Sequence, residues 1–239
     1  MEDWKQAFWL TKFELKYYLK SLLLLVAILI MLLIFIVPTM ADYFEDSFLS
    51  VDIFFIISFC FVTHWIRPKP FKIEDINSGF LLSPYLVLLQ QLPTRKEIIA
   101  KHRFFTYLII SIPFNILFLV PIYLLTPVIH DTMTIGSYTV FSIFWLCFSI
   151  YFGCLELITD TGMNKVPAIL RNLFLGFLLL MVMICLFYKV YPHGFVHWTI
   201  EISTNYPIIV TLISLLLAML GFKFWMGRMV RKIEMTDYL

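Results

Sequence analysis

Six long apolar segments dominate the pattern of hydrophobic and polar positions along this chain. They cover residues 22–37, 51–66, 104–126, 135–158, 172–191 and 206–227. A helix needs about 20 apolar residues to cross a lipid bilayer, and each segment is near that length. Runs such as Leu22–Val26 are apolar on every side, whereas β-barrel strands alternate apolar and polar positions. The pattern predicts an all-α membrane protein with six transmembrane helices in a single domain, residues 1–239.

The composition agrees with a membrane location. Of the 239 residues, 61% are hydrophobic and 14% are charged, against about 45–50% and about 25% in soluble domains. The formal net charge is +2, which provides no general affinity for polyanions. The composition therefore excludes a soluble enzyme, a large extracellular domain and a nucleic-acid-binding protein.

The basic residues are distributed unequally between the segments that connect the six apolar runs. Seventeen of the eighteen Lys and Arg residues lie near the two chain ends or in the second-to-third and fourth-to-fifth connections. The exception is Lys189, at the far end of the fifth run, where its long side chain can reach the membrane surface. Because basic segments remain in the cytoplasm, both termini are predicted to be cytoplasmic.

Residues 2–20 are too polar to cross a membrane, but they are patterned. On a helix, one stripe of this segment is apolar and another carries lysines. The stripes are Trp4, Phe8, Leu15 and Leu19, and Lys5, Lys12, Lys16 and Lys20. This pattern is typical of an amphipathic interfacial helix that lies on the membrane. Whether it is only an anchor or also docks a cytoplasmic partner stays open.

The connection at residues 67–103 is the one long polar segment, and it contains signals for two helices. Ser83 followed by Pro84 is typical of a helix start, and Pro93 ends the short apolar stretch that follows. Residues 94–97 match a capping box, which begins a second helix that continues into the third apolar segment. The short helix would present apolar side chains to a partner surface or to lipid headgroups.

The chain lacks the motifs of catalysis. None of its eight glycines is followed by lysine, so the phosphate-binding loop of an ATPase is missing, as are serine-hydrolase and zinc-protease motifs. We expect no catalytic residue, cofactor or metal in this chain. Glu156 could face a central pathway or pair with Arg171, whereas Asp52 and His64 lie near span ends, where water can solvate them.

One group of polar residues could bind a metal. His193, His197 and Glu201 share a four-residue spacing, which would align them on one helical face. Pro192 and Gly194 make a regular helix at the first histidine doubtful. The alternative interpretation is that the histidines are headgroup-level anchors on a short outer helix.

This arrangement resembles the type-2 ABC exporter permeases. The local signature, Leu92–Lys101, reads LPTRKEIIAK and is similar to a phrase that follows the coupling helix in bacterial members of that family. The resemblance implies that residues 84–91 are a coupling helix that inserts into a cytoplasmic ATP-binding cassette ATPase, which binds ATP and Mg²⁺. The residues expected at this contact are Tyr85, Leu86, Leu88, Leu89, Gln90, Arg95 and Glu97.

The same resemblance implies a dimer, formed with a second copy or a homologous permease, in the plasma membrane of a bacterium. Spans one, two and five would form the transport pathway, with Phe54, Phe55, Phe59, Phe174, Phe177 and Leu178 as candidate lining residues. Such a wall would suit export of a hydrophobic or amphipathic cargo, such as a peptide, an antibiotic or a lipid-like molecule. The short outer connection before the last span argues against an extended extracellular gate.

Two other functions stay open from the sequence. A stand-alone membrane enzyme or assembly factor would depend on Glu156 or on the set His193, His197 and Glu201. An ion-coupled secondary transporter would depend on a proton or sodium gradient, although we find no internal repeat of the kind such transporters often carry.

Overall fold

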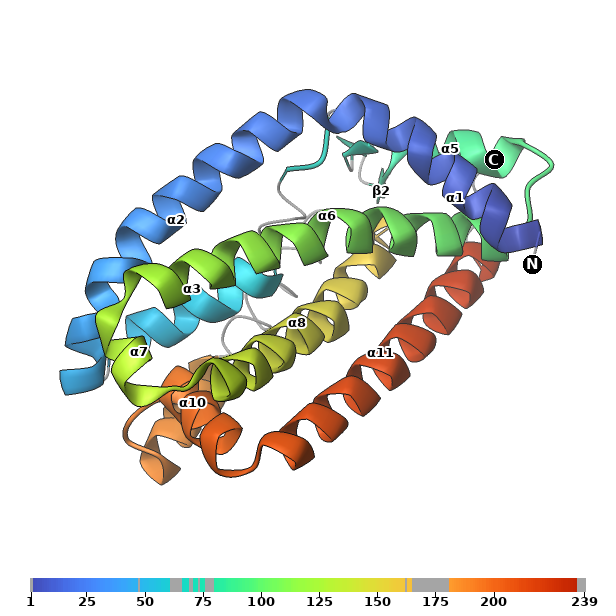
Figure 1. Cartoon of the computed structure of the whole chain (residues 1–239). Helices are drawn as coiled ribbons and strands as arrows, with labels where there is room; N and C mark the ends of the chain where they lie inside the picture. Colours follow the sequence, from blue (N-terminus) through green and yellow to red (C-terminus); the bar gives the residue numbers. More distant parts are fainter. Residues whose placement is uncertain are drawn as a thin grey trace.

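The protein is a bundle of helices with one small sheet (Figure 1). The computed structural model describes residues 2–46, 48–60, 66–68, 71–72, 74–75, 80–161, 163–164 and 181–235. Its longer helices are α1 (Glu2–Leu15), α2 (Leu19–Glu45), α3 (Leu49–Cys60), α6 (Lys96–Leu125), α8 (Ile135–Leu157), α10 (Phe195–Asn205) and α11 (Pro207–Met235). The shorter ones are η1 (Lys16–Tyr18), α5 (Pro84–Gln91), α7 (Pro127–Thr132) and η3 (Ile158–Thr161).

Four helices are long and apolar enough to cross a membrane. They comprise Ser21–Glu45 within α2, α6, Ile135–Leu155 within α8, and α11. These correspond to the first, third, fourth and sixth apolar segments of the sequence. The second and fifth segments contain shorter apolar helices, Leu49–Cys60 and Met181–Val190. Residues 61–65 and 165–180, which complete those two segments, lie outside the described residues.

The bundle has two distinct ends (Figure 1). The beginning of α1 and the end of α11 lie at the same end, together with α5, and we call it the α5 end. The short helices α7 and α10 lie at the opposite end, which we call the α10 end. α2 runs along one edge of the bundle and α11 along the other, and α8 packs against α11, α6, α10 and α3.

Two apolar cores hold the bundle together. The larger contains a group of tilted and edge-on aromatic rings, including Phe55, Phe59, Phe118, Phe141 and Trp145, and extends to the α10 end. Aromatic pairs of this kind contribute about 0.5–1.5 kcal/mol each beyond the area they bury. The smaller core lies at the α5 end and joins α5, α6, α8 and α11.

A three-stranded sheet departs from the predicted all-helical architecture. β1 (Glu74–Asp75), β2 (Phe80–Leu82) and β3 (Met163–Asn164) pair antiparallel in the order β1–β2–β3. Leu81 is the central residue, opposite Asp75 on one side and Met163 on the other. The sheet therefore ties the chain just before α5 to the chain just after η3. Strands of two or three residues are too short to show the alternation of apolar and polar residues by which a strand is predicted from sequence.

Candidate functional site

The predicted elbow between the second and third apolar segments is present. α5 has Pro84 at its first position and ends at Gln91, and α6 begins five residues later, at Lys96. Proline suits the first position of a helix because its preset φ is helical and its missing N–H would have had no partner. α6 then continues as one helix of 30 residues through the third apolar segment.

The predicted capping side chains do not cap these helices. Ser83 is the N-cap residue of α5, but its side chain makes no capping hydrogen bond. The N-cap residue of α6 is Arg95 rather than Thr94. The backbone N–H of Thr94 donates to the carbonyl of Leu92 at 2.6 Å, so this residue belongs to a tight turn before the helix. The capping-box prediction was therefore wrong.

The predicted coupling residues of α5 divide between a buried face and an exposed face. Leu86 and Leu89 are buried in the core at the α5 end, together with Ile99 and Met229. Leu88 points outward with 55% of its surface exposed. The apolar surface that α5 offers is therefore narrower than its sequence suggests. Of the other members of the set, Arg95 and Glu97 are exposed, and Tyr85 and Gln90 are partly buried.

α1 packs along α6 through a stripe that the sequence did not single out. Ala7, Thr11 and Glu14 follow the i, i+4, i+7 spacing of one helical face, and all three are buried. The aromatic residues of α1 lie elsewhere. Trp9 and Phe13, which the sequence stripe did not include, are exposed. A face of small and polar residues thus meets the protein, and aromatic residues face outward.

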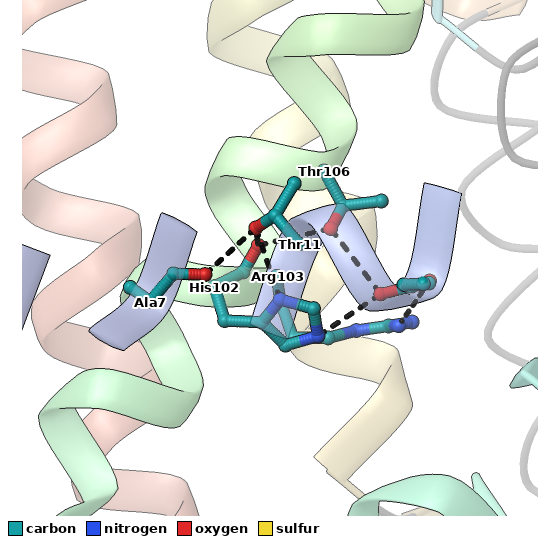
Figure 2. Close-up of polar contacts among 6 residues, drawn as sticks. Ala7, Thr11, His102, Arg103 and Thr106 are labelled. Carbon is teal, nitrogen blue, oxygen red and sulfur yellow. Dashed lines mark hydrogen bonds and ion pairs between the residues drawn. The ribbon is translucent and has the colours of Figure 1, made fainter. Parts of the chain in front are cut away.

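Glu14 is the centre of a buried polar cluster between α1 and α6. Figure 2 shows how Thr11, His102, Arg103 and Thr106 of this cluster lie. Its Oε1 lies 3.0 Å from Nη1 of Arg103, and its Oε2 lies 3.0 Å from Nε2 of His102. Thr106 donates a hydrogen bond from its hydroxyl to Oε2 at 3.2 Å. The other ring nitrogen of His102, Nδ1, lies 3.1 Å from the Thr11 hydroxyl, so both nitrogens face α1. We call Glu14, His102, Arg103, Thr11 and Thr106 the Glu14 cluster.

The charge of Glu14 is stabilised by its neighbours. Burial alone would raise the pKa of this carboxyl, but Arg103, His102 and Arg67 outweigh burial and hold the pKa below its ordinary value. A small cavity of about 20 Å³ lies beside the cluster and is lined by Glu14, Tyr18, Arg67 and Arg103, among others. A volume of that size accommodates about one water molecule.

A second, exposed group of contacts fixes the beginning of α1 to the beginning of α6. The Asp3 carboxylate lies 3.2 Å from Nζ of Lys101 and 3.5 Å from Nη1 of Arg95. Its hydrogen bond with Lys101 lowers the pKa of Asp3. The Lys101 ammonium also lies 5.0 Å from the ring centroid of Trp4, and that ring packs edge-on against Phe105. α1 is thus attached to α6 along its whole length.

The geometry of the Glu14 cluster suits anchoring. His102 and Glu14 have no exposed side-chain surface, and Arg103 has 3%. Enclosed in this way, the Glu14 carboxylate and the Arg103 guanidinium neutralise each other's charge, and His102 contacts the same carboxylate. Because a buried carboxylate without partners would be costly, the cluster fixes the position of α1 on α6.

The candidate pathway residues lie in several environments. Phe55 and Phe59 are fully buried in the larger core, against Phe118 and Trp145. Phe54 is partly buried, with its ring centroid 4.6 Å from that of Phe35 on α2. The other three candidates, Phe174, Phe177 and Leu178, lie outside the described residues.

Asp52 is buried at the α10 end, where the sequence suggested solvation by water. Its Oδ1 accepts hydrogen bonds from the Tyr43 hydroxyl at 2.8 Å and the backbone N–H of Val196 at 2.8 Å. Its Oδ2 accepts from the Tyr188 hydroxyl at 2.6 Å and the N–H of Phe195 at 2.9 Å. The carboxylate therefore caps the first turn of α10 and joins it to α2, α3 and the helix Met181–Val190.

The histidines that suggested a metal site lie beside Asp52, but a tyrosine separates the potential ligands. The Tyr191 hydroxyl lies 3.0 Å from Nδ1 of His197 and also donates to Glu201. The rings of His193 and His197 are tilted by 38° to each other, with their centroids 5.3 Å apart. Among the described residues, no three His, Cys, Asp or Glu side chains are arranged to hold a metal ion. The side chain of Glu156, and the residues His64 and Arg171, lie outside the described part of the chain.

The long apolar helices indicate the class of protein to which the fold is suited, a membrane protein. The chain contains four helices that are long and apolar enough to span a membrane, and this is compatible with a membrane location. Comparison with known protein families, with curated proteins and with solved structures finds no match to this chain.

Proposed function

We propose that this chain is the membrane-spanning permease subunit of an ATP-driven exporter, with a cytoplasmic ATPase as a separate partner. In this proposal the chain crosses the membrane six times, and both termini and the α5 end face the cytoplasm. The chain works as a dimer with a second copy or a homologous permease. ATP and Mg²⁺ bind to the partner ATPase.

The observation that carries the proposal is the elbow at the α5 end. α5 is an eight-residue helix between two apolar segments, and its exposed Leu88 lies close in sequence to exposed charged residues of the α6 start. An exposed apolar side chain on a short helix, followed along the chain by exposed charged residues, is suited to insertion into a cleft of another protein. The sequence signature at residues 92–101 follows this helix directly.

The distribution of charge supports the same orientation. Seventeen of the eighteen basic residues belong to the chain ends and to the two connections assigned to the cytoplasm. The beginning of α1 and the end of α11 both lie at the α5 end of the bundle (Figure 1), which is compatible with an even number of spans. The helices Leu49–Cys60 and Met181–Val190 contribute the second and fifth spans in the proposal.

The attachment of α1 to α6 supports a mechanical role for the α5 end. α5 and α1 both pack on α6, and the Glu14 cluster holds α1 in a fixed position. The helix α6 therefore carries α1 at a fixed position and α5 beside it, next to the proposed ATPase contact. The phenylalanine-rich composition suits a hydrophobic or amphipathic cargo, such as a peptide, an antibiotic or a lipid-like molecule.

The experiment is a comparison of two matched substitutions in the full chain, purified in mild detergent from its native membrane. Leu88→Asp puts a charge on the exposed face of α5. Ile135→Asp puts the same charge on a residue that is 74% exposed at the start of α8, away from α5. Leu89→Asp is unsuitable because Leu89 is 2% exposed and its substitution would disrupt the core.

We expect the parent chain and Ile135→Asp to co-purify with a soluble protein that hydrolyses ATP in the presence of Mg²⁺, and Leu88→Asp to lose it. Retention of the ATPase by Leu88→Asp would overturn the assignment of α5. If no ATPase co-purifies with the parent, and transport stops when the proton or sodium gradient is collapsed with ATP intact, the chain is a secondary transporter. Activity of the purified chain alone would instead indicate an enzyme.

A further inference from the structure

Unpaired polar atoms are concentrated on α5 and the residue before it. Buried polar side-chain atoms in folded proteins almost always have a hydrogen-bond partner. In the described part of the chain, eight such atoms make no hydrogen bond, although one of them, Nε2 of His102, lies 3.0 Å from the Glu14 carboxylate. Three of the remaining seven belong to Ser83, Tyr85 and Gln90. A segment of eight residues therefore holds a large share of the unpaired atoms.

The Ser83 hydroxyl is unpaired although its backbone is ready for capping. Ser83 has extended dihedral angles, φ −78° and ψ 121°, which are typical of an N-cap residue, and its carbonyl accepts the first hydrogen bond of α5. Its hydroxyl, however, bonds to none of the free N–H groups of the first turn. The residue is fully buried, so solvent does not supply the missing bond.

The Tyr85 hydroxyl is unpaired although a strong acceptor is near. The Tyr85 ring packs edge-on against Phe71, with centroids 4.7 Å apart, and against His102, with centroids 5.8 Å apart. His102 lies between Tyr85 and Glu14, since its Nε2 is 3.0 Å from the carboxylate. Burial, followed by the negative charge of Glu14, raises the pKa of Tyr85 to about 12.

Glu14 has the capacity to accept one more hydrogen bond. A carboxylate offers about four acceptor sites. Arg103, His102 and Thr106 contact three of them at 3.0 to 3.2 Å. Tyr85 and Glu14 both contact His102, so a movement of α5 along α6 is the change that would bring the Tyr85 hydroxyl to the free site.

A partner protein cannot satisfy these atoms while α5 stays in place. Each of the three atoms is buried inside the chain. The exposed side of α5, at Leu88, carries none of them. Pairing them requires α5 itself to move against α6, and leaving them unpaired is costly in the position that the structure records.

We propose that α5 has two positions against α6, and that in the second position the Tyr85 hydroxyl donates a hydrogen bond to the Glu14 carboxylate. The structure records the first position, in which Leu86 and Leu89 are buried and three polar atoms are unpaired. The second position exchanges part of the apolar contact for hydrogen bonds. Because the free energy lost with the apolar contact opposes the free energy gained from the hydrogen bonds, the proposal places both positions in the population of the isolated chain. The use of this movement to couple ATP hydrolysis to transport rests on the proposed function, but the movement itself does not.

The test measures the distance between α5 and α11 in the full chain by pulsed electron spin resonance. Spin labels are attached at Leu88→Cys and Met235→Cys, which are 55% and 80% exposed. The four native cysteines are first replaced by serine or alanine. The variant is Tyr85→Phe, which keeps the ring contacts and removes the hydroxyl. The control is Tyr17→Phe, because the Tyr17 ring also contacts Phe71, at 5.7 Å, and is exposed.

We expect two distances in the parent and in Tyr17→Phe, and at least a threefold loss of the second population in Tyr85→Phe. The thermal midpoint of Tyr85→Phe should equal or exceed that of the parent, because the variant removes an unpaired buried group. A single distance in the parent, or a second population unaffected by Tyr85→Phe, would overturn the proposal. So would a lower midpoint, since it would mean that the hydroxyl already has a partner. No ATPase is present in this measurement, so its failure is distinguishable from failure of the proposed function.

Discussion

The Glu14 cluster offers the sharpest test of what holds α1 in place. Glu14→Gln keeps the volume of the side chain but removes its charge, so no cavity forms. Arg103, with 3% of its side chain exposed, then loses the carboxylate at 3.0 Å. The new side chain has one oxygen and one NH₂ group, so either Arg103 or the pair His102 and Thr106 faces NH₂ in place of an acceptor oxygen. Breaking a buried ion pair by removing one partner costs about 3–5 kcal/mol.

This cost converts to a measurable change in melting temperature. For chains of 150–250 residues, 1 kcal/mol shifts the melting midpoint by about 2–4 °C, so Glu14→Gln should lower it by roughly 6 °C or more. The assay is thermal unfolding in detergent micelles, followed by tryptophan fluorescence. The control is Glu2→Gln, which makes the same chemical change at an exposed residue of the same helix and should leave the midpoint nearly unchanged.

A double-mutant cycle separates the ion pair from other effects of the substitution. If Glu14 and Arg103 stabilise each other, Glu14→Gln combined with Arg103→Gln should lose about 0.5–3 kcal/mol less than the sum of the two single variants. The reasoning fails if Glu14→Gln shifts the midpoint no more than Glu2→Gln. It also fails if the two single losses add, because the carboxylate would then act independently of the guanidinium.

Three further predictions concern the other buried groups. Gly194→Ala should destabilise the chain in the melting assay, because φ is +88° and the added methyl group would lie 2.5 Å from the Tyr43 hydroxyl. Its control, Gly227→Ala, adds a methyl group with nothing within 4 Å and should be neutral or stabilising. Asp52→Asn should cost at least about 2 kcal/mol and speed hydrogen exchange of the first amides of α10, and the exposed Asp42→Asn should do neither. The pKa of Glu14 is held below its ordinary 4.5, so its contribution is complete above that pH and lost as pH falls through the lowered pKa. The midpoint difference between parent and Glu14→Gln should therefore stay constant from about pH 8 to about pH 5 and shrink below about pH 4.5, measured as two pH series.

The parts of the fold that the sequence predicted are those that depend on local pattern. Apolar length located the four spanning helices, and the Ser83–Pro84 pair located the start of α5 to the residue. Pro93 marked the break before α6. Each of these signals acts within one helix or one turn, so the sequence alone is sufficient to read it.

The parts that were missed depend on partners far along the chain. Glu14 bonds to Arg103, which is 89 residues away, and Asp52 accepts from the N–H of Phe195, which is 143 residues away. A lone acid near a helix end is indistinguishable in sequence from a solvated one. One signal was available: Ala7, Thr11 and Glu14 form an i, i+4, i+7 stripe of small and polar residues opposite the exposed aromatics.

The two buried carboxylates together determine which parts of the bundle can move separately. Glu14 belongs to α1 and Asp52 to α3, so both lie on the first part of the chain, and each is satisfied mainly by groups from later helices. Glu14 holds this part to α6 at the α5 end, and Asp52 holds it to α10 and the helix Met181–Val190 at the α10 end. Sliding α2 along its axis would break one set or the other and leave a buried charge without partners. The first helices and α6 therefore form a fixed frame, and α5, whose polar atoms lack partners on that frame, is the element best able to change position against it.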